Sequence, residues 1–114
     1  MQPQFISFAQ TRAYELASGV TAKALFGEGA MLNLVELAPG AIVARHHHPH
    51  EQLGVILRGS MTLVVEGEDH VLDELDAYAL PGAVEHEGIA GPRGALVLDV
   101  FCPVREDYRR AADA

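Results

Sequence analysis

Residues 40–59 read GAIVARHHHPHEQLGVILRG, and no other stretch of the chain constrains the fold as strongly. An apolar run leads into three consecutive histidines, His46 to His48, and a second apolar run begins at Leu53. Pro49 separates the two runs, because proline has no amide hydrogen to donate within a β-ladder. The pattern predicts two β-strands joined by a short histidine-rich connection.

The same pattern extends in both directions. Apolar or alternating runs are interrupted by glycine or proline about every eight to twelve residues, which is typical of an all-β sandwich or barrel. The strands are predicted at 20–26, 31–37, 42–47, 52–58, 61–66, 70–72, 77–80, 85–89 and 95–101. The turns are expected at 39–40, 58–60, 66–69, 81–82 and 91–94. We interpret the whole as a meander of antiparallel strands, followed by a short frayed helix or solvated tail over 105–114.

Length and composition indicate one soluble domain. The chain has 114 residues, of which 49% are hydrophobic and 21% are charged, so it can bury one core. The formal net charge of −8 opposes binding to nucleic acid or to an anionic membrane. An anionic substrate would therefore need a local positive group, such as a metal ion or an arginine.

Two further features bear on location and assembly. The first ten residues lack a basic start and a long apolar stretch, and the single cysteine, Cys102, cannot form an internal disulfide. We therefore expect a cytoplasmic protein. Cys102 is expected to be a small buried side chain. The strand at 95–101 is apolar on both faces. A second sheet would cover one face, and the N-terminal strand or another copy of the chain would cover the other, so a homodimer is expected.

The histidines have the spacing of a metal site. Residues two apart on a strand point to the same face about 6–7 Å apart, so His46 and His48 can converge on one ion while His47 faces away. The chain must turn after Pro49, which brings Gln52 back towards that ion. The alternative is a histidine-rich surface loop without a site.

A further ligand is expected from the second half of the chain. His86 follows the tight turn at Pro81-Gly82 and begins a strand on which Val84, His86 and Gly88 share the inward face. A histidine that stood there alone would more often be structural. Its combination with the first cluster makes the metal-ligand interpretation the better one.

These two stretches resemble the two motifs of the cupin superfamily. The first motif is matched by Gly40, His46, His48, Gln52 and Gly59, with Gln52 in place of the usual glutamate. The second is weaker: Pro81 and His86 remain, whereas Leu75, Ala83 and Ala90 replace the usual glycine, glycine and asparagine. The resemblance implies an all-β double-stranded β-helix, or jelly-roll barrel. We expect a single domain over 1–114, with the core barrel at 19–104 and a C-terminal tail at 105–114.

The resemblance implies one divalent metal ion on His46, His48, Gln52 and His86. Glu51 is the better anionic ligand but lies out of register, and His50 is a less favoured alternative ligand. Three imidazoles and an amide leave the full charge on the ion, which favours a Lewis acid that binds anions. Nickel, zinc, iron or manganese would suit the site. Acidification through the histidine pKa range should release the metal.

Near the C-terminus, Asp99 shares a face with Val97 and Phe101. A buried unpaired carboxylate costs several kcal/mol, so Asp99 must be paired, with Arg105 as one candidate, exposed at the barrel mouth, or retained for chemistry. Ordinary core packing is the alternative role for Phe101, and a solvated charge near the chain end is the alternative for Arg105.

The run from Asp99 to Arg105, together with the histidine stretch, resembles the pectin degradation protein KdgF family, which are small cupins that open unsaturated uronate rings. The resemblance implies that Asp99, Phe101 and Arg105 line the pocket. Arg105 and the metal would hold a sugar-acid carboxylate, Asp99 would move a proton, and Phe101 would pack on the sugar. The alternatives are a metal-dependent cupin dioxygenase and a non-catalytic metal- or sugar-binding cupin.

Overall fold

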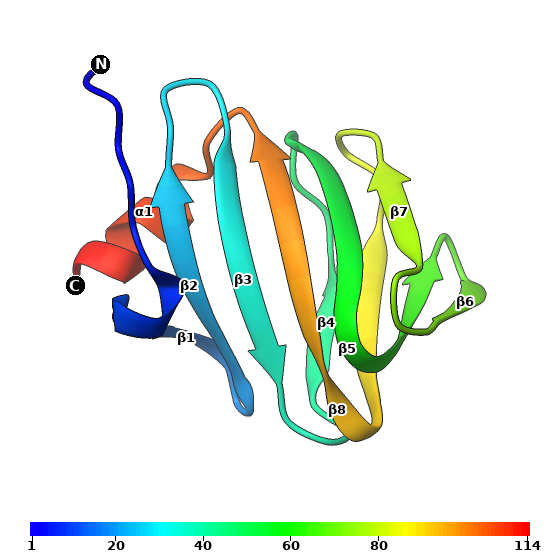
Figure 1. Ribbon diagram of the computed structural model, residues 1–114. Helices are drawn as coiled ribbons and strands as arrows, with labels where there is room; N and C mark the ends of the chain where they lie inside the picture. Colours follow the sequence, from blue (N-terminus) through cyan, green and yellow to red (C-terminus); the bar gives the residue numbers. More distant parts are fainter.

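The computed structural model describes residues 1–114, and its architecture is almost entirely β. In chain order the elements are η1 (Phe8–Gln10), β1 (Tyr14–Ala17), β2 (Val20–Phe26), β3 (Met31–Leu37), β4 (Ile42–His46), β5 (Glu51–Val65), β6 (Glu68–Leu72), β7 (Ala77–Leu80), β8 (His86–Cys102) and α1 (Glu106–Asp113). Figure 1 shows β2, β3, β8, β5 and β7 side by side in one layer, with β4 behind them. The predicted all-β fold is confirmed.

Two long strands connect the layers. β5 and β8 pair with each other from Glu51 opposite Cys102 to Val65 opposite His86. The first part of β5 pairs with β7 and its last part with β6, while β8 pairs first with β4 and then with β3. Each of these strands therefore begins in one layer and ends in the other, and the core is enclosed between the layers.

The turns predicted at 58–60 and 91–94 are wrong. β5 and β8 run through these segments as continuous strands, although the register shifts between Ile56 and Arg58 and again between Gly59 and Met61. Gly59 and Gly94 have positive φ angles of 77° and 76°. Glycine at these positions lets the paired strands bend together rather than reverse, because a bulge sharpens the local twist without breaking the ladder.

The meander is also wrong. The order of the main sheet is β1-β2-β3-β8-β5-β6, so β3 lies beside β8 rather than beside the next strand in the sequence. The segment 95–101 takes a central place between β3 and β5. A strand that is apolar on both faces favours such a central place, because neighbours on both sides satisfy its backbone and packing can cover its side chains.

The core lies between the layers and reaches the C-terminal helix. Its most deeply buried members include Val20, Ile56 and Val97, each at most 2% exposed. Tyr108 and Ala111 of α1 pack against this cluster, so the tail is a helix attached to the barrel. Figure 1 places α1 beside β2, on the same side of the molecule as the N-terminus.

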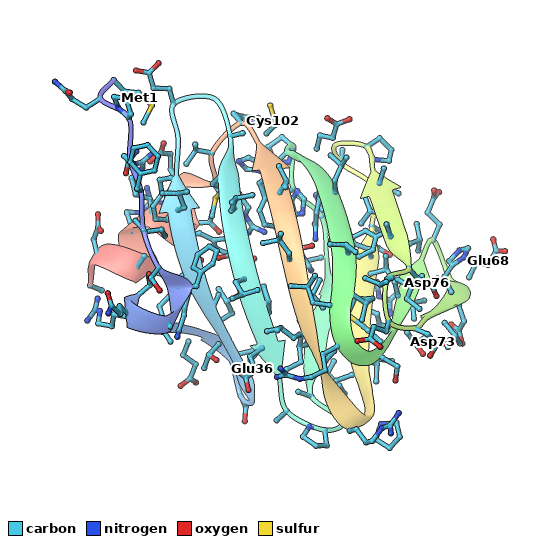
Figure 2. The ribbon with its side chains drawn as sticks, viewed as in Figure 1. Met1, Glu36, Glu68, Asp73, Asp76 and Cys102 are labelled. Carbon is cyan, nitrogen blue, oxygen red and sulfur yellow. The ribbon has the colours of Figure 1, made fainter.

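Other features of the chain lie at the surface. Cys102 is exposed at the end of β8, which corrects the expectation of a buried thiol (Figure 2). The acidic residues Glu68, Asp73 and Asp76 gather around β6 and the connection that follows it (Figure 2). No helix of the structure is long and apolar enough to cross a bilayer.

The bend at Gly59 gives a stability prediction. A Cβ atom at Gly59 would overlap the backbone carbonyl of Gly94, whereas Gly40 has a similar φ of 70° and open space around it. Gly59→Ala should lower the free energy of unfolding by about 2–4 kcal/mol, and Gly40→Ala by only about 1–2 kcal/mol. Urea unfolding of the two variants measures the difference. Equal losses would show that only the φ angle matters at the bend.

Candidate metal centre

Three histidines from two parts of the chain meet inside the barrel. His46 ends β4, His48 lies in the connection that follows, and His86 begins β8 opposite His46. One ring nitrogen of each lies within 4.8 Å of those of the other two, and the ring centroids of His46 and His86 are 4.4 Å apart. The structure therefore brings together three of the four residues that the sequence predicts as ligands, and these three could hold a metal ion.

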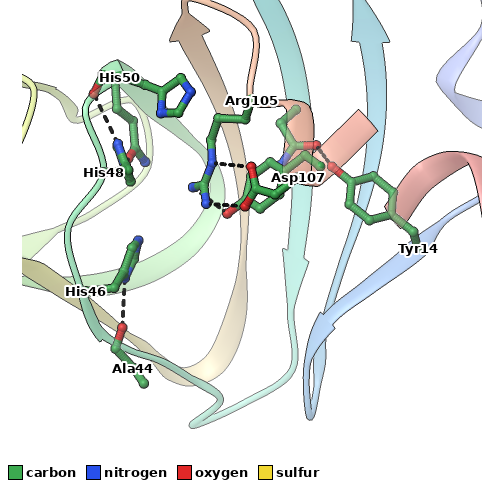
Figure 3. A network of polar contacts seen from close by, with 10 residues as sticks. Tyr14, Ala44, His46, His48, His50, Arg105 and Asp107 are labelled. Atoms are coloured by element: carbon green, nitrogen blue, oxygen red, sulfur yellow. Dashed lines mark hydrogen bonds and ion pairs between the residues drawn. The ribbon is translucent and has the colours of Figure 1, made fainter. Parts of the chain in front are cut away.

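The other ring nitrogens are held by the backbone. The Nδ1 atom of His46 lies 2.8 Å from the carbonyl oxygen of Ala44, and that of His48 lies 3.1 Å from the carbonyl oxygen of His50 (Figure 3). The Nδ1 atom of His86 is 2.9 Å from the carbonyl oxygen of Val84. A neutral imidazole that donates from Nδ1 keeps its lone pair on Nε2, which is the usual arrangement for a metal-binding histidine.

Burial keeps these rings in the form that binds metal. Burial first, and then the positive charge of Arg105, lower the pKa of His48 from 6.5 to about 4. Burial also lowers the pKa of His86. Both rings are therefore neutral at pH 7, and a neutral imidazole is the form that coordinates a cation.

Gln52 completes the group of four. Its Oε1 atom lies 3.1 Å from Nε2 of His48, and its side chain is buried. Glu51 is exposed on the other face of β5, as the alternation predicts. His50 is half-buried beside His48, with their ring centroids 5.6 Å apart, but it does not belong to the group of three histidines. The geometry thus favours Gln52 over the two alternatives.

The amide of Gln52 also faces the carboxylate that the sequence singled out. Its side chain lies close enough to both Asp99 and Tyr78 to act to lower their pKa values, while its oxygen is directed at His48. An amide can accept at one end and donate at the other, which a carboxylate cannot do. Glutamine in place of the usual glutamate therefore joins the histidine cluster to Asp99 without placing two carboxylates side by side.

Asp99 is buried in the barrel interior and does not form the ion pair with Arg105 that we considered. The hydroxyl of Tyr78 donates a hydrogen bond of 2.5 Å to Oδ1 of Asp99. Burial raises the pKa of Asp99 to about 6, against the opposing effects of Tyr78, Gln52 and the charge of Arg105. A carboxyl group with a pKa this close to neutrality can both accept and return a proton.

Arg105 is buried at the end of the barrel and pairs with Asp107 instead. Its Nε and Nη2 atoms donate to the carboxylate of Asp107 at 3.3 Å and 2.8 Å, and its Nη1 donates to the hydroxyl of Tyr108 at 2.8 Å (Figure 3). The guanidinium carbon lies 5.2 Å from the ring centroid of Phe101, whose ring is 5.6 Å from that of His48. Asp107 and Tyr108 therefore fix the position of the Arg105 guanidinium, and some of its N–H groups remain free to donate.

A cavity joins these side chains. Its polar lining includes His46, Gln52, His86, Asp99 and Arg105, and Phe101, Val97 and Met61 contribute to its apolar wall. All of the predicted site residues except His48 line this cavity. His48 lies directly behind the lining, where it contacts Gln52 and Phe101. The arrangement sets a cation site, a carboxylate and a guanidinium around one space.

Sequence reasoning missed two polar residues of this cavity, Asn33 and Tyr108. It also did not predict whether Tyr78 faces the cavity, the core or the surface. Asn33 is 1% exposed; its Oδ1 accepts a hydrogen bond from the hydroxyl of Tyr14 at 2.6 Å, and its Nδ2 has no partner within the chain. A signal for Asn33 was present, because it is the one polar residue on the inward face of β3.

A protein-family model described as Cupin domain matches residues 33–101, which is more than half of the chain. The chain belongs to the cupin family. This cupin is 32% identical over 96 residues to the pectin degradation protein KdgF of Dickeya dadantii (strain 3937), a match that covers 82% of this chain and 87% of the relative. It is thus a homologue of KdgF, as the motifs indicated.

Solved structures agree with this placement. KdgF from a Halomonas species superposes on this cupin with a TM-score of 0.88 and 27% identity, covering 94% of this chain and 99% of the other. An RmlC-like cupin from Shewanella frigidimarina superposes with a TM-score of 0.87 and 28% identity, covering 94% and 96%. The barrel is therefore shared along almost the whole length of these proteins.

The lowered pKa values change the expected response to acid. Because the folded pKa of His48 is about 4 and the unfolded value about 6.5, protonation of this ring is delayed on acidification. Bound zinc or nickel should be retained at pH 6 and released nearer pH 4, as measured by elemental analysis after buffer exchange. At His48 the folded chain binds fewer protons than the unfolded chain between these values, so this ring lowers the stability of the metal-free protein as the pH falls, whereas the raised pKa of Asp99 acts in the opposite direction over the lower part of the window. Release that is complete at pH 6 would contradict the structure.

Proposed function

We propose that this cupin binds one divalent metal ion on His46, His48, Gln52 and His86 and opens the ring of unsaturated uronate monosaccharides to give linear keto sugar acids. The observation that carries the proposal is the buried Asp99, whose pKa of about 6 and place between Gln52 and Tyr78 suit proton transfer beside the ion. The homology to KdgF supports the substrate class.

The residues fit a metal ion. Three imidazoles can direct Nε2 inward, and the amide oxygen of Gln52 adds an oxygen donor. When bound there, the ion would supply a Lewis acid that attracts the oxygen atoms of an acidic sugar. Nickel, zinc, iron and manganese all accept this mixture of imidazole and amide ligands.

Arg105 would bind the carboxylate of the sugar acid. Its guanidinium has five N–H groups, and Asp107 and Tyr108 take three of them. One hydrogen on Nη1 and one on Nη2 remain, and these can donate to the oxygens of a carboxylate. The net charge of −8 repels an anionic substrate, and the positive charge of Arg105 inside the cavity would offset that repulsion locally.

Asp99 would carry the proton. It takes the proton of the anomeric hydroxyl as the anomeric carbon–oxygen double bond forms and the bond between that carbon and the ring oxygen breaks. The electrons of the broken bond leave the former ring oxygen as an enolate, and Asp99 returns the proton to the vinylic carbon, which leaves a ketone. The sequence is an isomerisation that consumes no water and no oxidant, and Phe101 would pack on the sugar during it.

This function is tested by following unsaturated galacturonate and guluronate by NMR with the metal-loaded protein. Wild-type protein should exceed the spontaneous rate of ring opening. Asp99→Asn should lower kcat by about 10²- to 10⁴-fold, because general acid–base catalysis is worth that much, and Arg105→Lys should mainly raise KM. The matched controls are Asp69→Asn and Arg110→Lys, since both side chains are exposed.

Three results would overturn the proposal. Asp99→Asn with wild-type turnover removes the proton carrier. Oxygen uptake with the same substrates would favour a cupin dioxygenase, and binding without any turnover would favour a sugar-binding cupin.

We also propose a homodimer formed through the outer face of the front layer. Leu34, Leu98 and Val55 lie opposite one another on adjacent strands and alternate with the inward side chains. None of the three is charged, and the charge next to them in the row, on Lys23 opposite Leu34, is opposite in sign to the net charge of −8. Sedimentation should give a dimer for the wild type, a monomer for Leu98→Glu, and a dimer for the control Val71→Glu, whose side chain is 69% exposed on β6. A monomeric wild type would contradict this assembly.

A further inference from the structure

Three residues form one row across three neighbouring strands. Tyr78 of β7 lies directly opposite Gly54 of β5, and Gly54 lies directly opposite Asp99 of β8. Tyr78 and Asp99 both line the cavity. A pair of this kind, separated by a whole strand, can touch only if the residue between them leaves the space free.

Gly54 leaves that space. A Cβ atom built on Gly54 would overlap the ring and hydroxyl of Tyr78, and would also lie 2.5 Å from Oδ1 of Asp99. The φ angle of Gly54 is not positive, so the backbone does not require glycine here. Glycine is required here because the side chain of Tyr78 crosses over β5 at this position to reach Asp99.

The contact itself is short and specific. The Tyr78 hydroxyl donates to Oδ1 of Asp99 at 2.5 Å. A phenylalanine would fill the same apolar surroundings equally well, so packing alone does not account for the hydroxyl. A hydrogen bond to one carboxylate oxygen fixes the plane of the group and therefore the direction of its remaining lone pairs.

We propose that Tyr78 is a positioning residue that orients the Asp99 carboxylate for proton transfer, and that Gly54 provides the space through which it does so. The proposal rests on the proposed function, because it assigns Asp99 a reacting proton. It adds a residue pair, Tyr78 and Gly54, that acts on the substrate only through Asp99.

Two variants test the same contact from opposite sides. Tyr78→Phe removes the hydroxyl, and Gly54→Ala keeps the tyrosine but pushes it away from Asp99. Each should lower kcat by about 10- to 100-fold, the cost of misplacing a reacting group by about 1 Å. KM should stay at the wild-type value, because Arg105 is untouched, and kcat is compared at equal metal content, because Gln52 lies beside Tyr78. Gly29→Ala is the matched control, since a Cβ atom there meets nothing within 4 Å.

A double variant separates positioning from a structural role. In an Asp99→Asn background, Tyr78→Phe should cause no further loss of kcat, because Tyr78 then has no carboxylate to orient. A loss of the same size in both backgrounds would overturn the proposal, as would a wild-type kcat in Tyr78→Phe. Thermal unfolding of each variant checks that the fold is retained.

A measurement without substrate distinguishes failure of this inference from failure of the proposed function. The hydroxyl proton of Tyr78 should give a downfield ¹H NMR resonance in the wild type that disappears in Asp99→Asn and in Gly54→Ala. Absence of this resonance in the wild type would overturn the inference. Wild-type protein that shows the resonance but never exceeds the spontaneous rate would instead overturn the proposed ring opening, and with it the reacting role given to Asp99.

Discussion

The pairing of β5 with β8 is the constraint on which the rest of the molecule depends. These two strands stay hydrogen-bonded through a shared bend, so they carry side chains from one layer to the other while remaining in register. His86 lies at the start of one strand, Gln52 near the start of the other, and Asp99 in the row beside Gly54. A slip by one residue would turn each of these side chains to the opposite face of its strand. The geometry of the cavity is thus a consequence of strand register.

Burial sets the charge state of the cavity, and it acts in opposite directions on its acids and bases. The same loss of water that lowers the pKa of His48 raises the pKa of Asp99. The pKa of His48 thus moves away from neutral pH, which leaves the imidazole neutral and ready for a cation, whereas the pKa of Asp99 moves towards neutral pH, which leaves the carboxyl group close to exchanging its proton. Gln52 is compatible with both neighbours because an amide has a donor and an acceptor but no charge. A glutamate in its place would add a second negative charge next to Asp99.

The sequence was sufficient where the information is local. Period-two alternation placed β2, β3 and β7 correctly and set Asp99 on the inward face, and the spacing of His46, His48 and Gln52 identified side chains that meet in space. The bends were misread because glycine with positive φ serves a tight turn and a bulge equally well. The sheet order was misread because pairing between distant strands leaves no trace in alternation. Tyr78 could not be placed for a similar reason: its partner is reached across another strand.

The cavity is built from two parts of the chain that are positioned in different ways. The histidines and Gln52 belong to barrel strands and the connection between them, where register leaves little freedom, whereas Arg105 and Tyr108 come from the short tail that follows the last strand. Substitutions in the last ten residues would change the charge and shape of the cavity while leaving His46, His48 and His86 where they are. The shape and charge of the cavity wall and the position of the three histidines are therefore encoded in separable segments of the chain.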